Sequence, residues 1–138
     1  IQADFVKVVL DTNVIVAAFA ARGLCADLYE LCIAEHRVIL SKPMLEEVSR
    51  NLARKVKLPP TLAANIVHYL QSEAEIVEPA KVRENACRDK SDLMVLGTAE
   101  AGKADAIVTG DKDLLILHKF RTTPILYPRD FWSLQRKP

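Results

Sequence analysis

The sequence predicts an α/β domain, a three-layer α/β/α sandwich whose central sheet is mostly parallel. Short apolar runs with the composition of buried strands alternate with longer segments of helical periodicity, which is the pattern of parallel strands joined by helical crossovers. The connections between these segments are only a few residues long, as expected when consecutive elements pack next to one another.

Length and composition indicate one domain that spans residues 1–138. Half of the residues are apolar and 27% are charged, which is typical of a soluble globular protein. The longest apolar run, Val14 to Ala21, is far shorter than the ~20 residues of a membrane span. We therefore expect a cytoplasmic protein with no membrane partner. The net charge of +1 neither requires nor excludes a nucleic-acid partner.

The N-terminal half is expected to contain two buried strands and four helices. Residues 5–10 and 38–40 are rich in β-branched and apolar side chains, which favours strands. A largely apolar helix at 12–21 and an amphipathic helix at 24–35 are separated by Gly23. Ser41 is the predicted N-cap of the next helix, which the pair Pro59 and Pro60 ends, and a further helix follows at 61–74.

The C-terminal half continues the alternation with shorter elements. A brief strand at 76–77 leads into a polar linker and a charged turn at 87–92. Gly102 is expected to end the helix that follows this turn. The remaining expected elements, in chain order, are that helix at 93–101, a strand at 104–108, a helix at 112–117, a strand at 124–126 and a helix at 130–134.

Two acidic residues are predicted to lie at the same edge of the sheet. Asp11 directly follows the first strand, and Asp111 lies shortly after the strand at 104–108. The carboxyl ends of parallel strands meet at one edge, and open α/β sheets bind ligands there. Each of these residues also precedes a helix, so a capping role is an alternative that the pattern leaves open.

Asp92 and the pair Glu46 and Glu47 are further candidates. At ~100° per residue, Asp92 lies within about 60° of Val95 and Ala99 and so extends the inward face of its helix. A carboxylate in this position needs a partner, and a cap, a helix dipole or a shared acidic pocket would each supply one. Glu46 and Glu47 both lie roughly 130° from the centre of the apolar face of their helix, so the pattern does not distinguish between them.

A convergence of these carboxylates would require shared protons or bound cations. Repulsion among three or four close acids is relieved in these two ways. Sites made only of oxygen ligands select hard ions, and Mg²⁺ or Mn²⁺ fits best because either ion also binds substrate phosphate. This is the chemistry of metal-dependent nucleases. The three cysteines form no C-x-x-C pair, so no zinc motif is present.

Four segments, taken in order, resemble a known family. They are the strand that ends in Asp11-Thr12-Asn13, the helix with Leu45-Glu46-Glu47-Val48, the Cys-Arg-Asp-Lys-Ser-Asp turn at 87–92, and the segment 104–115 with Thr109-Gly110-Asp111-Lys112-Asp113. Together they resemble a PIN domain over essentially the whole chain. The branch that they match best contains the small prokaryotic toxins of type II toxin–antitoxin pairs, the virulence-associated protein C-like proteins.

The resemblance implies an endoribonuclease that cuts single-stranded RNA with Mg²⁺ or Mn²⁺. Carried over position by position, the catalytic and metal-binding residues are Asp11, Glu47, Asp92 and Asp111. The three aspartates would ligate the ion or ions, and Glu47 would hold a second ion or position the water that a metal activates. Glu47 matches the family, and Glu46 does not, because of its spacing from Ser41.

The resemblance also implies auxiliary residues and partners. Asn13 and Thr109 match polar positions that orient a metal-bound water or a carboxylate, and Asp89 and Asp113 match auxiliary acids. The implied partners are an RNA substrate, an antitoxin protein and further copies of the chain in a homodimer or higher homo-oligomer.

Two other functions compete with this interpretation. The first is a PIN-like module that binds RNA or protein without cutting it, although a non-catalytic descendant would be free to lose one of the four acids. The second is an aspartyl-phosphate phosphatase. Those enzymes carry a second aspartate two residues after the nucleophile, and Asn13 occupies that position here.

Overall fold

The computed structural model describes residues 5–135, and the other residues of the predicted domain 1–138 lie outside this part. The described chain contains one sheet whose strands are β1 (Lys7–Leu10), β2 (Arg37–Leu40), β3 (Glu75–Ile76), β4 (Ala106–Val108), β5 (Lys119–Phe120) and β6 (Thr123–Leu126). The strand order is β3-β2-β1-β4-β6-β5. All neighbours are parallel except β5 and β6, which confirms the predicted, mostly parallel sheet.

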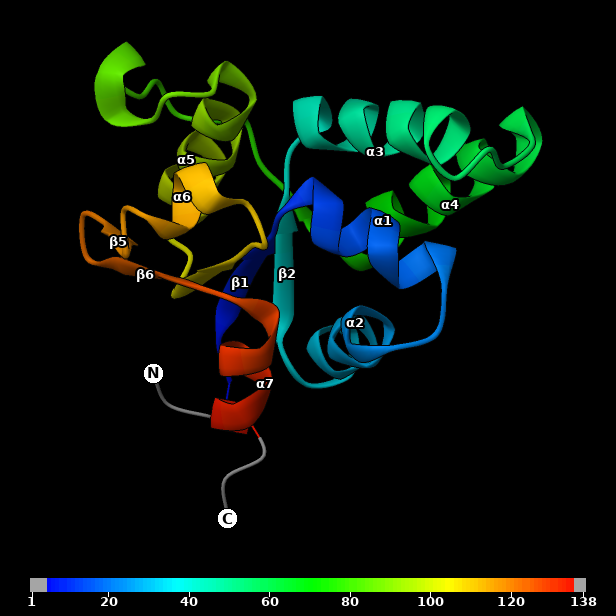
Figure 1. Ribbon diagram of the computed structural model, residues 1–138, viewed down its shortest axis with the longest axis horizontal. Helices are drawn as coiled ribbons and strands as arrows, with labels where there is room; N and C mark the ends of the chain where they lie inside the picture. Colours follow the sequence, from blue (N-terminus) through cyan, green and yellow to red (C-terminus); the bar gives the residue numbers. More distant parts are fainter. Residues whose placement is uncertain (1–4, 136–138) are drawn as a thin grey trace.

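Helices cover both sides of this sheet. They are α1 (Thr12–Ala20), α2 (Leu24–Glu35), α3 (Lys42–Arg54), α4 (Pro60–Glu73), α5 (Lys90–Gly102), α6 (Lys112–Leu115) and α7 (Pro128–Gln135), with a short 3₁₀ turn η1 (Glu84–Ala86). Figure 1 shows α1, α2, α3 and α4 on one side of β1 and β2 and α5 and α6 on the other, so the predicted three-layer arrangement is confirmed. None of the helices within residues 5–135 has the length and apolar character needed to cross a membrane.

The central strands are apolar because helices cover both of their faces. Val8, Val9 and Leu10 of β1 are fully buried, as are the corresponding residues of β2 and β4. Helix α5 packs very closely on β2, because a Cβ added at Gly102 would lie 2.5 Å from Cγ2 of Ile39. This close packing sets the distance between α5 and the sheet.

The order of the strands places a topological switch point at the carboxyl ends of β1 and β4. From β1 the chain proceeds to β2 and β3 on one side, and it then returns to β4, β6 and β5 on the other. Ligands bind at such a switch point in open α/β sheets. Figure 1 shows α3, α5 and α6 gathered around the end of the sheet at which β1 and β2 finish.

The start of α5 and the end of α3 differ from the prediction. Helix α5 begins at Lys90, three residues before the predicted start at Leu93, because Oδ1 of Asp89 caps it by accepting hydrogen bonds from the N–H and Oγ of Ser91, both at 2.9 Å. Helix α3 ends at Arg54 and not at the proline pair. The chain turns at Lys57, whose φ of 63° is left-handed.

Strand β5 was not predicted from the sequence. It pairs antiparallel with β6 through a two-residue turn at Arg121 and Thr122, and Arg121 adopts a left-handed φ of 55°. Such turns usually carry Gly, Asn or Asp, so this sequence gives no signal for the hairpin. On α4, the apolar side chains of Leu62 and Tyr69 are 44% and 41% exposed. The other predicted elements begin and end within two residues of the observed ones.

Candidate active site

Asp11 lies at this switch point, buried and held by hydrogen bonds on both carboxylate oxygens. Its Oδ1 accepts a hydrogen bond from the N–H of Thr12 at 2.7 Å, which caps α1, and its Oδ2 accepts one from Oγ1 of Thr109, also at 2.7 Å. Its own N–H donates to the carbonyl of Val108 at the end of β4. Asp11 therefore caps a helix and also occupies the shared edge, so the two explanations left open by the sequence both hold.

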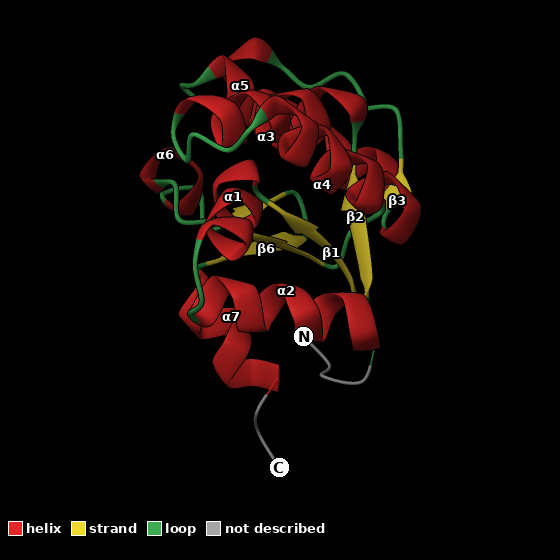
Figure 2. Cartoon of the chain, turned by 90° about the vertical axis from the view of Figure 1, so that its right-hand side faces the viewer, coloured by secondary structure: helices red, strands yellow, loops and turns green. Residues whose placement is uncertain are grey.

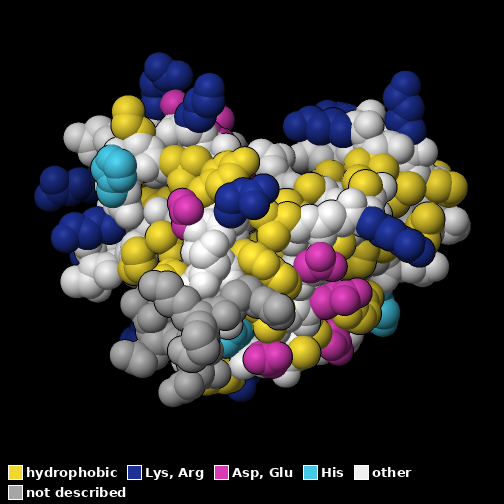
Figure 3. Space-filling model, turned by 60° about the horizontal axis from the view of Figure 1, so that its bottom comes forward, with side chains coloured by type: hydrophobic (Ala, Val, Ile, Leu, Met, Phe, Trp, Pro, Cys, Tyr) yellow, Lys and Arg dark blue, Asp and Glu magenta, His cyan; other side chains and the backbone are white. Residues whose placement is uncertain are grey.

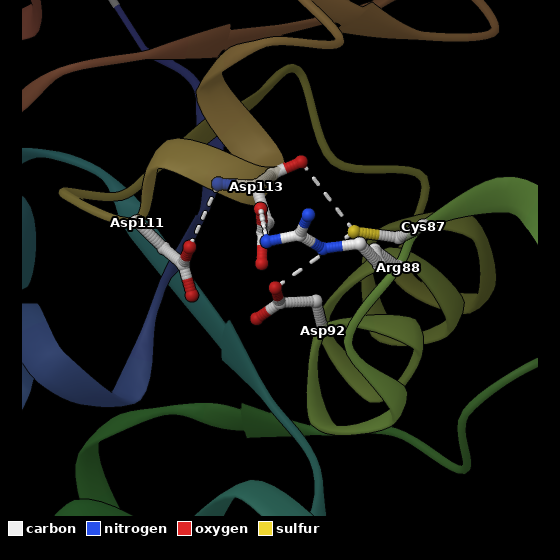
Figure 4. A network of polar contacts seen from close by, with 5 residues as sticks. All are labelled: Cys87, Arg88, Asp92, Asp111 and Asp113. Carbon is white, nitrogen blue, oxygen red and sulfur yellow. Dashed lines mark hydrogen bonds and ion pairs between the residues drawn. The ribbon is translucent and has the colours of Figure 1, made fainter.

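Asp92 and Asp111 bring their carboxylates to the same place. Asp111 caps α6 by accepting a hydrogen bond from the N–H of Asp113 at 2.8 Å, and Asp92 is buried in the first turn of α5. Carboxylate oxygens of Asp11, Asp92 and Asp111 all lie within 4.8 Å of one another. Figure 4 shows the carboxylates of Asp92 and Asp111 facing a common space. We call these three residues the aspartate cluster.

Glu47 adjoins the aspartate cluster through Thr12. The hydroxyl of Thr12 donates a hydrogen bond to Oε1 of Glu47 at 2.6 Å and lies 3.4 Å from Oδ1 of Asp11. Glu47 is half-buried, whereas Glu46 is exposed to solvent. The packing of α3 thus separates two glutamates that the sequence pattern left equivalent. The carboxylate of Glu47 is not one of the three that lie within 4.8 Å of one another.

The predicted auxiliary residues occupy different surroundings. Thr109 joins the two strand ends, since its hydroxyl donates to Asp11 and accepts a hydrogen bond from the N–H of Asp111 at 2.9 Å. Asp89 and Asp113 form a second close group with Asp92, and Asp113 pairs with the exposed Arg88 at 3.4 Å. Asn13 is exposed and makes no hydrogen bond with the cluster in the described part of the chain, so its role toward a bound water stays a prediction.

Two residues that contact the acids were not predicted from the sequence. Thr12 holds Glu47, and its position directly after Asp11 was an available signal. The second residue is Cys87, which is buried. Its Sγ donates to Oδ2 of Asp92 at 3.8 Å and lies 3.5 Å from the carbonyl oxygen of Asp113 (Figure 4). No sequence signal pointed to this contact, because it depends on how the 83–89 segment folds back on α5.

Comparison with known proteins identifies the family. The family profile described as the PIN domain matches residues 7–113. The chain belongs to the PIN domain family. No curated protein matches this PIN domain significantly.

Solved structures support the same fold. VapBC2 from Rickettsia felis, solved bound to a DNA fragment from its promoter, is 15% identical with a TM-score of 0.63, and the match covers 88% of this chain and 98% of that one. VapBC-1 from nontypeable Haemophilus influenzae is 13% identical with a TM-score of 0.63, covering 89% and 98%. DNA-bound VapBC from Salmonella typhimurium is 18% identical with a TM-score of 0.60, also covering 89% and 98%. At these identities the likeness shows that the fold is shared.

Burial and mutual repulsion alter the acidity of this PIN domain's cluster. Burial, followed by the charges of Asp111, Asp11 and Asp89, raises the pKa of Asp92 from 3.8 to about 7. Burial also raises the pKa of Asp11, while the hydrogen bonds from Thr109 and Thr12 oppose the rise. Protons or a bound cation must therefore offset the repulsion among these carboxylates.

The aspartate cluster fits a hard divalent cation. Its ligand atoms are all carboxylate oxygens, they come from three separate elements, and they are close enough to share one ion. A cation would offset the repulsion that raises the pKa of Asp92. Asp11 and Asp111 are the better oriented ligands, because backbone N–H groups and the hydroxyl of Thr109 fix their carboxylates.

Without a divalent cation, the free energy of unfolding is expected to fall as the pH rises from about 4 to 7. Between the ordinary pKa of 3.8 and the raised value of about 7, the folded protein retains a proton on Asp92 that the unfolded chain releases. The decline should approach about 1.4 kcal/mol per pH unit at most. Urea unfolding at pH 5.5 and 7.5 in EDTA measures it. Saturating Mn²⁺ should restore stability at pH 7.5, and equal stability at both pH values in EDTA would contradict the raised pKa.

Proposed function

We propose that this PIN domain is an endoribonuclease that hydrolyses phosphodiester bonds of single-stranded RNA and depends on Mg²⁺ or Mn²⁺. The observation that carries the proposal is the convergence of Asp11, Asp92 and Asp111 within 4.8 Å at the switch point of the sheet. Three acids separated along the chain meet where the fold places a ligand, and their chemistry suits a metal that binds phosphate.

Each residue has a distinct role in this proposal. Asp11, Asp92 and Asp111 hold the ion, and Thr109 keeps the carboxylate of Asp11 in place. Glu47 lies beside them to position the attacking water or a second ion, with Thr12 fixing its carboxylate. When bound, the divalent cation supplies an activated water and stabilises the charge that develops on the phosphate. No side-chain nucleophile is required.

The electrostatics favour an enzyme over a module that binds RNA or protein without cutting it. Burying three carboxylates together destabilises the metal-free fold, as the raised pKa of Asp92 indicates. A surface that only binds a partner has no use for such a cluster. An RNA backbone would also be repelled by it unless a cation lay between them.

We further propose that the nuclease is the toxin of a toxin–antitoxin pair and acts in the cytoplasm. The support is the resemblance of its motifs to the small prokaryotic toxins, together with a fold shared with VapBC assemblies. The same support extends to an antitoxin protein as partner and to a homodimer or higher homo-oligomer.

Cleavage of a labelled, unstructured RNA tests the catalytic proposal directly. We expect no cleavage in EDTA and recovery with Mg²⁺ or Mn²⁺. Glu47→Gln should lower the rate about 10- to 100-fold, because it removes a charge beside the cluster, while Glu46→Gln, one residue away on the exposed side of α3, should stay within about twofold. Metal-independent cleavage, or equal effects of the two variants, would contradict the assignment.

A further inference from the structure

A hollow of about 320 Å³ lies between the connection from α1 to α2 and the start of α7. Figure 2 shows the α1–α2 loop passing beside α7, on the same side of the sheet as α2. Ala17, Ala21 and Leu24 supply apolar walls, and Arg22, Tyr127 and Arg129 supply the larger side chains. The aspartate cluster is not part of it.

The charge of this hollow is positive. Arg22 and Arg129 are both exposed, and neither forms an ion pair within the described residues. None of the residues that line the hollow is acidic. On the face shown in Figure 3, Lys and Arg side chains lie singly or in small groups among hydrophobic and acidic ones. Attraction for a polyanion must therefore come from local sites, and two unpaired arginines beside one hollow form such a site.

Tyr127 connects the hollow to the active site. It directly follows β6 and is 48% exposed. A Cβ added at Gly110 would lie 4.0 Å from Cε1 of Tyr127, so the ring lies against the loop that carries Asp111. The N–H of Thr109 also donates to the carbonyl of Leu126 at 3.0 Å. The tyrosine therefore stands between the aspartate cluster and the two arginines.

We propose that this hollow is a binding site for the RNA strand next to the bond that is cut. A base stacks on the ring of Tyr127, and a backbone phosphate lies between Arg22 and Arg129. Aromatic rings with flanking cations are the usual platform for single-stranded nucleic acid, whose bases are free to stack. Along α1, the hollow begins six residues from Asp11 and ends ten residues from it, or roughly 9–15 Å at 1.5 Å per residue, a span that a few nucleotides cover.

The site deepens the proposed ribonuclease function and rests on it. Binding of a fluorescent single-stranded RNA in EDTA, where cleavage is not expected, measures the site separately from catalysis. Arg22→Ala with Arg129→Ala should weaken binding about tenfold or more. It should also lower the slope of log Kd against log salt by about 0.7, the contribution of the one phosphate contact that is lost on a single strand. The control, Arg37→Ala with Lys103→Ala, removes two exposed charges that do not line the hollow, one at the start of β2 and one just after α5, and should leave both values unchanged.

Tyr127 is tested by a pair of substitutions. Tyr127→Ala should weaken binding about tenfold without changing the salt slope, while Tyr127→Phe should retain binding because its ring still stacks. An unchanged salt slope in the arginine variant, equal losses for the two tyrosine variants, or loss of a protein partner with normal RNA binding would overturn the site. If the unaltered chain does not cut RNA with Mn²⁺, the proposed function fails. If it cuts RNA and the variants bind normally, only this inference fails.

Discussion

Replacing Asp11 by Asn is expected to reduce RNA cleavage by about 10³-fold or more while the protein stays folded. The substitution removes the central charge of the aspartate cluster. The amide oxygen can still accept the hydrogen bond from the N–H of Thr12, and the amide nitrogen can donate to the hydroxyl of Thr109. The cap of α1 and the contact with β4 therefore survive, and the loss belongs to the site and not to the fold.

Single-turnover cleavage with Mn²⁺ measures the effect, and circular dichroism with urea unfolding verifies the fold. The same variant tests the toxin role, because expression of the unaltered chain should arrest growth of a bacterial host and Asp11→Asn should not. Co-expression of the cognate antitoxin should relieve the arrest. Undiminished cleavage by a folded Asp11→Asn chain would reject the assigned site, and absence of arrest by an active enzyme would reject the toxin role alone.

Replacing Asp92 by Asn is expected to make the metal-free protein more stable and the enzyme inactive. The carboxylate of Asp92 is buried near Asp111 and Asp11, and its pKa is raised to about 7. A neutral amide of the same shape removes this repulsion, so the free energy of unfolding at pH 8 in EDTA should rise by about 1 to 3 kcal/mol. Cleavage should fall by about 10²-fold or more, because one of the three ligands has lost its charge.

The comparison with Asp27→Asn separates this effect from the interaction of a first-turn acid with the helix dipole. Asp27 also lies in the first turn of a helix, α2, but it is exposed to solvent. Its replacement should lower stability by about 0.3 to 1 kcal/mol, because a negative charge near a helix N-terminus is favourable. Urea unfolding of both variants at pH 8 measures the change in the free energy of unfolding, which should be positive for Asp92→Asn and negative for Asp27→Asn. A loss of stability in Asp92→Asn would show that the favourable interaction with the helix dipole outweighs repulsion, contrary to our expectation.

The candidate site could be predicted from the sequence where it depends on strand ends. Asp11 and Asp111 follow buried parallel strands, and the carboxyl ends of such strands lie at one edge of the sheet. The closeness of the two carboxylates therefore follows from local pattern and general topology. Which of the two glutamates lies beside the aspartate cluster could not be predicted from the pattern, because Glu46 and Glu47 flank the apolar face of α3 symmetrically. Of the two glutamates, Glu47 accepts the hydrogen bond from the hydroxyl of Thr12, and this contact depends on how α3 packs against α1.

The amino-acid sequence carried the order of strands and helices, the mostly parallel sheet and the family resemblance, because these depend on short-range periodicity and on motifs in fixed order. The hairpin of β5 and β6 could not be predicted from it, because Arg121, with a left-handed backbone conformation, stands where such turns usually carry Gly, Asn or Asp. Nor did it show the thiol beside Asp92, the raised pKa of that carboxyl, or the hollow beside Tyr127. These features arise from distances between residues remote in the chain, and such distances exist only after the helices have packed on the sheet.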